Sequence, residues 1–396
     1  MSSLQYLQWA IGLTRYLLKT LGLWPEKLKN RREDLLSKLS LLFNMFIVIF
    51  VLTIPALTAL KKVWGDMELM IDNLQYTLPL LISILKVFTI WYNKEALSPL
   101  IDMIIEDWMK TKMKEERNVM LKQAKIVRLV TVCGVFMILG LVTIVFSAFF
   151  YGQMINYTTN LTDLIGKPLP IPTYYLYDIS SSPKYEITYL IQLIGLIACG
   201  LYYTAIDNLL VFLVLHICGQ IENLHLRLLN LRAESNFKVI LKHNVKDHIR
   251  LIRSTEIVDD TFNLMILGLL FLFGILFCLH GFLIINVIKI QSDSLSTVNC
   301  IWYISSSVCV LMHTGIYCAG GEFLVTQSEK IFYAAYEYSW YNLEPKVAKE
   351  LILIMLRAKK PLNITAGKTF PMTMSTFCNL LKTSAGYVSV LFANNN

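Results

Sequence analysis

Seven runs of mostly apolar residues recur along this chain of 396 residues. A helix needs about 20 apolar residues to cross the hydrocarbon core of a bilayer, and each run is long enough. Only 16% of the residues are charged, whereas a soluble domain carries about 25%. The sequence therefore predicts an all-α integral membrane protein with seven transmembrane helices. The predicted spans are residues 35–60, 67–92, 126–151, 187–218, 262–288, 300–327 and 370–392.

Lys and Arg residues are distributed unevenly between the two sides that these spans define. Four segments on one side carry seven each: 1–38, 93–125, 217–260 and 328–368. The linkers on the other side carry two, two and one: 61–66, 152–186 and 289–299. Because positively charged loops stay in the cytoplasm, the N-terminus is predicted to be cytoplasmic and the C-terminus extracellular. This orientation is opposite to that of a G-protein-coupled receptor.

Two glycosylation sequons agree with this orientation. Asn156-Tyr-Thr and Asn160-Leu-Thr both lie in the 152–186 loop, which the charge distribution assigns to the outside. We therefore predict a glycoprotein that is modified at Asn156 and Asn160.

The N-terminal residues 1–34 contain an apolar stretch that Arg15 and Lys19 interrupt. A cleavable signal peptide has an unbroken apolar region followed by small residues, so none is expected. We predict an amphipathic interfacial or re-entrant helix that ends at Trp24-Pro25. A soluble helix packed on the cytoplasmic side is the alternative.

The long cytoplasmic segments show helical periodicity, which argues against the alternative of flexible linkers. Apolar residues recur at every third or fourth position, as at Ile221, Leu224 and Leu228. The transmembrane helices are therefore expected to continue into the cytoplasm through residues 93–125 and 217–260 and to pack there as a bundle.

The motifs of several other functional classes are absent. The chain has no His-Glu-x-x-His, no complete phosphate-binding loop and no Gly-x-Ser-x-Gly, so it is not expected to be an enzyme. None of the eight cysteines is spaced as CxxC, so neither a metal site nor a cofactor is indicated. The basic stretches lack the interleaved aromatic residues of a nucleic-acid-binding surface. A small-molecule membrane transporter remains an alternative, although no internal repeat is visible.

Three motifs follow one another from Glu322 to the C-terminus. The first is an aromatic-rich helix that ends in Tyr336-x-x-x-Trp340, and the second is Arg-Ala-Lys-Lys-Pro-Leu at 357–362. The third is Thr-Ala-Gly-Lys at 365–368, which leads into a last span containing Tyr387. In this order they resemble the C-terminal region of insect odorant receptors.

The resemblance has identifiable departures. Gly386-Tyr387 stands where many relatives have Ser-Tyr, and the Thr-Tyr and Gln-Phe pairs of gustatory receptors are absent. The chain also lacks the long cytoplasmic insertion of the odorant receptor coreceptor, so it resembles a tuning subunit. A gustatory-type ligand-gated channel is the alternative within the same superfamily.

The resemblance implies a ligand-gated, non-selective cation channel, in which four copies of the last helix surround one pore. It implies the coreceptor as partner in a heterotetramer, a small volatile hydrophobic ligand, permeating cations and membrane lipids. The implied location is the plasma membrane of an olfactory sensory neuron dendrite. The expected regions are the N-terminal helix at 1–34, a ligand-binding region at 35–327, cytoplasmic anchor helices at 328–368 and a pore-lining helix at 369–396.

Polar residues in the last span recur with helical spacing. Together with the apolar Val390 they form one stripe, which consists of Thr369, Thr373, Thr376, Thr383, Tyr387, Val390 and Asn394. Polar side chains in a membrane helix face a partner or water rather than lipid, so this stripe is predicted to line the pore. The alternative is that the Thr hydroxyls bond their own backbone and serve helix packing. By alignment of motifs with the family, Val390 occupies the hydrophobic gate position, and the predicted pore and gate residues are Thr383, Tyr387, Val390 and Asn394.

The family resemblance places the ligand pocket in the outer half of the membrane, between spans two, three, four and six. These half-spans are rich in aromatic residues, which suit a hydrocarbon ligand, although aromatic residues also form interfacial belts. The candidate ligand-binding residues are Tyr76, Phe146, Phe149, Phe150, Tyr189, Gln192, Trp302, Tyr303 and Ser306.

Charged residues within the predicted spans need partners there. Lys86 and Asp207 both fall towards the cytoplasmic halves of their spans, and we predict that they pair. His313 and Glu322 lie in the inner half of span six and are expected to make structural pairs rather than a proton relay.

Overall fold

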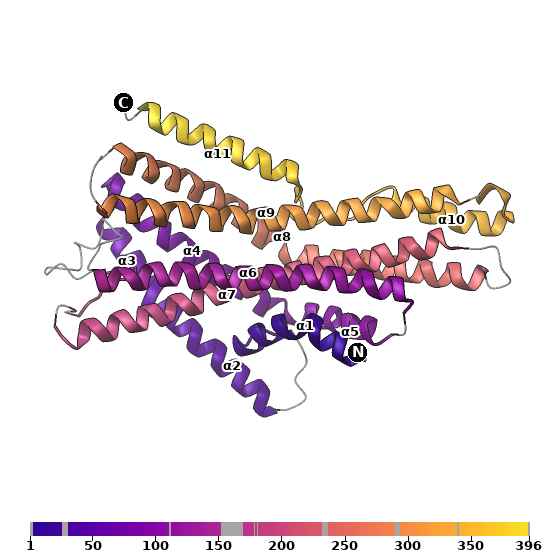
Figure 1. The fold of residues 1–396 in the computed structure, drawn as a ribbon, viewed down its shortest axis with the longest axis horizontal. Coiled ribbons are helices and arrows are strands. Elements are labelled where there is room, and N and C mark those ends of the chain that lie inside the picture. Colours follow the sequence, from indigo (N-terminus) through magenta and orange to yellow (C-terminus); the bar gives the residue numbers. More distant parts are fainter. Residues whose placement is uncertain are drawn as a thin grey trace.

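The computed structural model describes residues 3–25, 31–110, 112–151, 169–177, 179, 181–231, 237–289, 294–338 and 340–394, and these are almost entirely helical. Long helices run side by side along the longest dimension of the molecule (Figure 1). The elements are α1 (Ser3–Thr20), α2 (Arg31–Phe46), the π-helix η1 (Ile47–Thr53), α3 (Ile54–Lys62), α4 (Met67–Tyr92), α5 (Lys94–Met109), α6 (Lys114–Tyr151), α7 (Lys184–Leu229), α8 (Phe237–Lys289), α9 (Ser294–Glu337), the 3₁₀-helix η3 (Trp340–Asn342), α10 (Pro345–Ala358), β1 (Thr365–Ala366), β2 (Phe370–Pro371) and α11 (Met374–Asn394).

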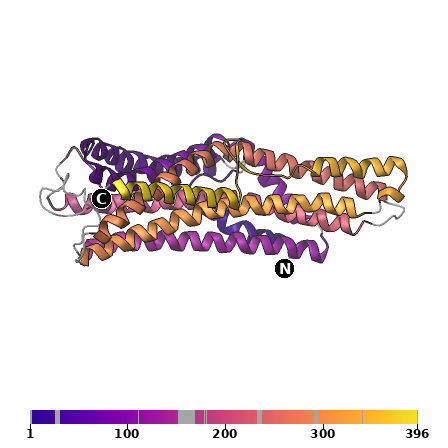
Figure 2. The same ribbon diagram turned by 90° about the horizontal axis from the view of Figure 1, so that it is seen from above.

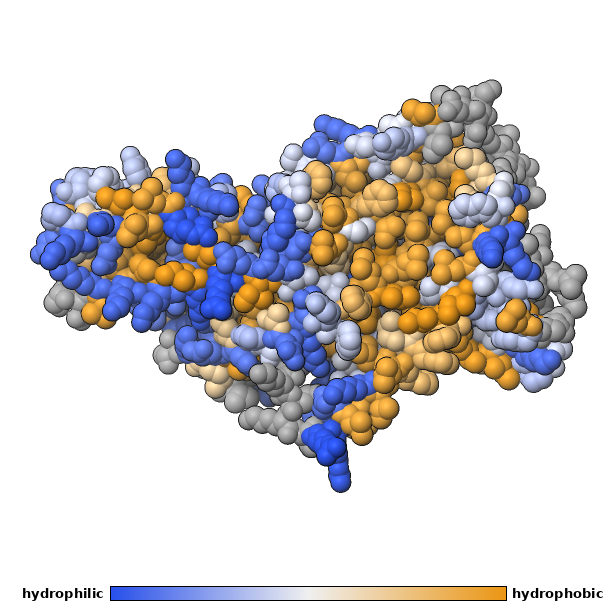
Figure 3. Space-filling model, turned by 180° about the vertical axis from the view of Figure 1, so that it is seen from behind, coloured by the Kyte–Doolittle hydropathy of each residue, from blue (hydrophilic) through white to orange (hydrophobic). Residues whose placement is uncertain are grey.

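Six helical stretches of the described residues are long and apolar enough to cross a membrane. They are Arg31–Lys62, Leu69–Tyr92, Lys114–Phe146, Lys184–Leu229, Phe237–Ile285 and Cys300–Asn342. Each contains or overlaps one of the first six predicted spans. Figure 3 shows the corresponding band of apolar side chains on the broader half of the molecule, whereas the narrow end is mostly hydrophilic.

The seventh predicted span corresponds to α11, which is not one of these six stretches. It begins at Met374 and not at Phe370, because Phe370 and Pro371 form strand β2. The prediction of its start was therefore wrong by one helical turn. Thr, Ser and Asn residues lower the apolarity of this helix, as the sequence indicated.

The first span is continuous but changes its helical form in the middle. Pro55 lies at the start of α3 and cannot donate a backbone hydrogen bond to the carbonyl of Val51, four residues earlier. The π-helix η1 occupies the preceding turns, and the Tyr175 hydroxyl donates to that Val51 carbonyl at 2.8 Å. A side chain from the segment before α7 thus satisfies the acceptor that the proline leaves open.

Some of the transmembrane helices continue beyond the apolar band, as their periodicity predicted, but α4 ends at Tyr92 and the separate helix α5 begins at Lys94. α7 runs without a break to Leu229, and α8 starts at Phe237 and runs without a break through its predicted span. Together with α10 and the C-terminal part of α9 they form the narrow end of the molecule, and α5 packs against α8 at its base (Figures 1 and 2). We call this end the anchor bundle.

Charged residues hold the anchor bundle together. Arg227 on α7 binds Glu116 on α6 and lies 2.7 Å from Asp247 on α8. Asp107 on α5 is buried and lies 2.8 Å from Arg250 and 3.2 Å from His216. Burial alone raises the pKa of Asp107, but these two neighbours outweigh it and hold that pKa well below its usual value. The carboxylate is therefore ionised at any physiological pH and ties α5 to α7 and α8.

The N-terminal helix α1 packs against α5, α6 and α7. Ile11, Leu18 and Leu23 are buried, and the Tyr202 hydroxyl of α7 donates to the Leu21 carbonyl at 3.0 Å. The helix ends at Thr20, shortly before the predicted end at Trp24-Pro25, and Trp24 is buried. α1 and the residues that follow it to Trp24 are thus packed on the junction between the apolar band and the anchor bundle.

Candidate functional site

A cavity of about 200 Å³ lies in the apolar half of the molecule among α4, α6, α7, α8 and α9. We call it the outer cavity. Its lining is almost wholly apolar, with aromatic and polar side chains on α4, α7 and α9. The lining includes Gln75, Tyr76, Ile171, Cys199, Tyr203, Thr204, His280, Trp302, Ser306, Cys309 and His313.

Tyr76 and Trp302 form one wall of the outer cavity. Their rings are stacked, with centroids 5.6 Å apart and planes 15° apart. The Trp302 indole N–H donates to Gln75 Oε1 at 3.3 Å, so the ring is also fixed by a polar contact to α4. Stacked aromatic rings contribute a flat apolar surface at low entropic cost.

Three polar atoms on the lining residues have no hydrogen-bond partner in the part of the chain that the structure describes. They are Tyr76 Oη, Thr204 Oγ1 and His280 Nδ1. The other ring nitrogen of His280, Nε2, lies 3.4 Å from Ser306 Oγ. Because buried polar atoms are usually paired, these three atoms offer hydrogen bonds to a ligand or to water.

The structure brings only some of the candidate ligand-binding residues to this cavity. Tyr76, Trp302 and Ser306 line it. Tyr303 is fully buried beside Ile71 and Phe282, on the other side of α9, and does not line it.

Tyr189 and Gln192 lie nearer the outer end of α7 and also outside the lining. The Tyr189 hydroxyl donates to the Val145 carbonyl at 3.1 Å. The Gln192 amide donates to Thr173 Oγ1 at 2.8 Å and to the Tyr175 hydroxyl at 2.9 Å. Gln192 therefore stabilises the segment that carries the lining residue Ile171, although its own side chain does not line the cavity.

The candidates on α6 are not part of the lining either. Phe146 is exposed and lies outside the outer cavity. The side chains of Phe149 and Phe150 lie outside the described residues, as do both predicted glycosylation sites, Asn156 and Asn160.

Several lining residues were missed by the sequence reasoning. Trp302, Ser306, Cys309 and His313 lie at intervals of four, three and four residues, so they share one face of α9. The two predicted members of this set already implied the other two. No predicted lining residue lies at helical spacing from Thr204 or His280, so the sequence did not indicate which face of their helices would meet the cavity.

The innermost part of the outer cavity borders a buried charged cluster. Lys86 is 0% exposed and its ammonium lies 2.5 Å from Asp207 Oδ1, which confirms the predicted pair. His313 Nδ1 lies 2.6 Å from Asp207 Oδ2, and the Tyr317 hydroxyl donates to the same carboxylate. The Lys86 ammonium also lies 3.2 Å from the centroid of the Tyr203 ring. We call Lys86, Asp207, His313 and Tyr317 the charged floor.

The charged floor lies at the inner end of the outer cavity and links three of the helices that line it, α4, α7 and α9. Tyr203 and His313 line the outer cavity, whereas Lys86, Asp207 and Tyr317 lie below the lining. No Asp, Glu, Lys or Arg is among the described residues that line the outer cavity. The contacts of His313 and Tyr317 with Asp207 help to offset the hydration that a buried ion pair loses.

The Thr-Ala-Gly-Lys motif forms a hairpin directly before α11. β1 and β2 pair around Gly367 and Lys368, whose φ angles are +60° and +59°. Asp259 on α8 accepts bonds from the Thr365 N–H at 2.7 Å and the Thr365 hydroxyl at 2.8 Å, and lies 2.6 Å from Lys368 Nζ. These contacts hold Lys368 in the left-handed region, which costs a non-glycine residue about 1 kcal/mol or more.

Electrostatics strengthens this attachment. Burial alone lowers the pKa of Lys368, but its hydrogen bonds to Asp259 and Asp260 outweigh that effect and raise the pKa above its ordinary value. A lysine whose pKa is higher in the folded than in the unfolded state stabilises the fold at any pH below the unfolded-state pKa. This stabilisation is lost only as the pH rises through the folded-state pKa. The hairpin is therefore attached to α8 throughout the neutral range.

The start of α11 is capped by side chains. Thr373 Oγ1 accepts the Thr376 N–H at 3.4 Å, and Glu322 accepts the Met374 N–H at 3.3 Å. A carboxylate at a helix N-terminus is favourable because the helix dipole is positive there. Thr369 and Thr373 precede the helix, so they do not belong to the predicted helical stripe.

Thr376 is half-buried, and the next members of the predicted stripe lie on the exposed side of α11. Tyr387 is 61% exposed and Val390 is 58% exposed, and Thr383 is also exposed. The helix packs on α8 and α9, where Ser384 is buried. The Thr383 hydroxyl donates to the Asn379 carbonyl at 2.8 Å, as the packing alternative expected. The side chain of Asn394 lies outside the described residues.

Comparisons with known proteins agree on one family. A family model described as "7tm Odorant receptor" matches residues 66–385. Odorant receptor 13a of Drosophila melanogaster is 27% identical over 248 residues, which are 58% of this chain and 58% of that protein. Odorant receptor 10 of Aedes albopictus is 28% identical over 216 residues, 53% of this chain and 56% of that protein. The chain thus matches a little over half the length of these curated relatives.

Solved structures show the same fold over the whole length. The insect olfactory receptor OR5 from Machilis hrabei, in complex with eugenol, superposes with a TM-score of 0.77. The alignment covers 99% of both chains at 16% sequence identity. The structure of the same receptor described without eugenol superposes with a TM-score of 0.74. The family match covers most of the chain, and the chain therefore belongs to the seven-transmembrane odorant receptor family and not to any class of enzyme.

Proposed function

We propose that this protein is the tuning subunit of an odorant-gated, non-selective cation channel. The observation that carries the proposal is the outer cavity, an apolar space of about 200 Å³ with a few unpaired polar atoms inside a membrane helix bundle. Ligand pockets are mostly apolar and use a small number of polar groups to orient the ligand. A small volatile with a hydrocarbon body and one hydrogen-bonding group matches this chemistry.

The properties of α11 support a pore. Thr383, Tyr387 and Val390 form an exposed surface that one chain alone does not cover. In a tetramer, four copies of this surface would surround a central pore, with Val390 as an apolar ring that closes by dewetting. α11 contains no Asp or Glu, so the pore would discriminate weakly among cations.

The expected partner is the odorant receptor coreceptor, in a heterotetramer in the plasma membrane of an olfactory dendrite. This part of the proposal follows from membership of the family and from the absence of a long cytoplasmic insertion between α7 and α8. Eugenol is the ligand in the structure of the Machilis receptor. It combines an aromatic body with oxygen atoms, and it is a suitable first compound to test here.

Recording whole-cell current during application of a volatile panel tests this proposal. We expect fast currents when this subunit and the coreceptor are expressed together, with G-protein signalling blocked, and no current from this subunit alone. In the same system, Val390→Ala should raise the current without ligand, because a smaller apolar ring dewets less readily. Surface-expressed protein that gives neither odorant-evoked current nor leak in Val390→Ala would contradict the channel function.

Substitution of Ser306 by Leu tests the ligand site. The larger side chain occupies part of the outer cavity and removes the hydroxyl beside His280. We expect the half-maximal ligand concentration to rise roughly tenfold or more, the equivalent of one lost hydrogen bond. Dose–response curves of the co-expressed channel provide the measurement.

Ser305→Leu is the matched control for that experiment. Ser305 is the preceding residue on α9, makes the same kind of bond to its own backbone, and does not line the outer cavity. Equal shifts in the two variants would mean that ligand does not bind in the outer cavity.

A further inference from the structure

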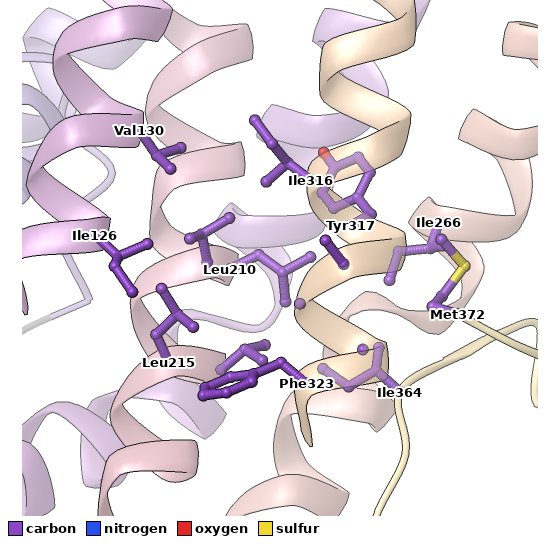
Figure 4. A pocket seen from close by; sticks show the side chains of 15 residues that line it. Ile126, Val130, Leu210, Leu215, Ile266, Ile316, Tyr317, Phe323, Ile364 and Met372 are labelled. Atoms are coloured by element: carbon purple, nitrogen blue, oxygen red, sulfur yellow. The ribbon is translucent and has the colours of Figure 1, made fainter. Parts of the chain in front are cut away.

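A second cavity, of about 240 Å³, lies on the anchor-bundle side of the charged floor. Figure 4 shows side chains from α6, α7, α8 and α9 converging on it, together with Ile364 and Met372 from the segment that leads to α11. We call it the inner cavity. Its lining also includes Ile126, Val130, Tyr317, Gly320 and Phe323.

The chemistry of the inner cavity selects a hydrocarbon occupant. The Tyr317 hydroxyl is the only polar side-chain group of its lining, and it already donates to Asp207. A buried water needs two to four polar partners, which this lining does not offer. An engineered apolar cavity of roughly 150 Å³ is enough to hold benzene, and the inner cavity is larger. A methylene chain would fit both its volume and its lining.

The position of the inner cavity indicates where such a chain would come from. Ile126 lines the cavity and is also exposed on the outer face of α6. The same face continues with exposed Leu129 and with Phe136, which is 69% exposed. Ile126 stands at the start of the third span, so this entrance lies where the hydrocarbon core meets the cytoplasmic headgroups.

Charge at the same level suits a phospholipid. Lys122, Lys125 and Arg128 are exposed on α6 within one turn of Ile126. Basic side chains at this depth attract the phosphates of lipid headgroups. A lipid whose phosphate meets these residues would have its acyl chain beside the entrance at Ile126.

We propose that the inner cavity binds one acyl chain of a phospholipid from the cytoplasmic leaflet. The bound chain contacts Met372 and Ile364, which flank the hairpin before α11, and Tyr317, which is part of the charged floor of the outer cavity. A bound lipid therefore contacts the hairpin before α11 and the charged floor, which are the two structural elements that join the outer cavity to the last helix. The site is separate from the odorant site, and it persists whichever odorant the outer cavity takes.

Photolabelling of the full chain in lipid vesicles tests this inference. The purified protein is reconstituted in phosphatidylcholine that carries a diazirine near the end of one acyl chain, irradiated, and mapped by mass spectrometry. We expect adducts on the cavity residues Val130 and Phe323 in addition to those on the outer face of α6. In Gly320→Leu the adducts on the cavity residues should be lost, because the new side chain fills the cavity. The Cβ at this position meets nothing nearer than Val214 Cγ1 at 3.8 Å, so the fold accepts the change.

Gly140→Leu is the matched control. Gly140 lies on the exposed face of α6, has no atom within 4 Å of an added Cβ, and is not part of the inner cavity. This variant should keep the adducts on Val130 and Phe323. An unlabelled cavity in the unsubstituted protein, or cavity adducts that survive in Gly320→Leu, would overturn the proposal. Labelling by a free diazirine-bearing alkane but not by the lipid would assign the cavity to a small hydrocarbon and overturn the lipid occupant.

Discussion

Replacement of Asp207 by Ala is expected to destabilise this receptor by about 3–5 kcal/mol, since it leaves a buried lysine without its counter-ion. The carboxylate is the centre of the charged floor, where Lys86, His313 and Tyr317 all contact it. These partners come from α4 and α9, so the loss also removes the polar links between α7 and these two helices. Thermal unfolding of the purified chain in detergent, together with the amount of protein at the cell surface, provides the measurement.

Two further variants separate the buried pair from a general effect of losing charge. Asp102→Ala removes an exposed carboxylate from α5 and should change the stability by less than about 0.5 kcal/mol. The double variant Lys86→Met, Asp207→Leu removes both charges and should recover part of the lost stability, because a well-packed apolar pair often replaces a buried ion pair. If Asp207→Ala were as stable as the unsubstituted protein, the ion pair would have no structural role.

Replacement of Asp259 by Ala is expected to detach the hairpin that precedes α11. Three contacts of about 1 kcal/mol each are lost, for a total of about 2–4 kcal/mol. The hairpin then loses the support that holds Lys368 at positive φ. We expect odorant-evoked current to fall to background while a fraction of the protein still reaches the surface.

Asp260→Ala serves as the control for this substitution. Asp260 is the neighbouring residue and also binds Lys368, at 2.5 Å, but its side chain is 69% exposed and it makes no bond to Thr365. An exposed ion pair contributes little, so this variant should retain its evoked current. Equal loss of current in both variants would show that the Lys368 charge matters and that attachment of the hairpin through Thr365 does not.

Much of the fold could be predicted because it depends on local composition. The first six spans and the helical extensions of α7 and α8 follow from runs of apolar residues and from their spacing. The Lys86–Asp207 pair was also predictable, because a charge inside a membrane span must find a partner and these two residues lie at similar depth. The hairpin before α11 was missed because its strands are two residues long and depend on Asp259, which is more than 100 residues away.

The ligand site was predictable only in part. Tyr76, Trp302 and Ser306 were chosen for their type and depth, and they line the outer cavity. Tyr303 was chosen for the same reasons, yet it points to a different cluster because it is the next residue on the helix after Trp302.

Length, apolarity and charge along the chain were sufficient to identify a seven-helix membrane protein and the pairing of its buried charges. The packing of the helices was needed to assign Thr204 and His280 to the outer cavity, Thr373 to the cap of α11, and a second apolar space to the region below the charged floor. The physical reason is rotation about the helix axis. Hydropathy measures how deep a residue lies in the membrane, but the face that a helix presents to its neighbours is set by contacts with residues far away in the sequence.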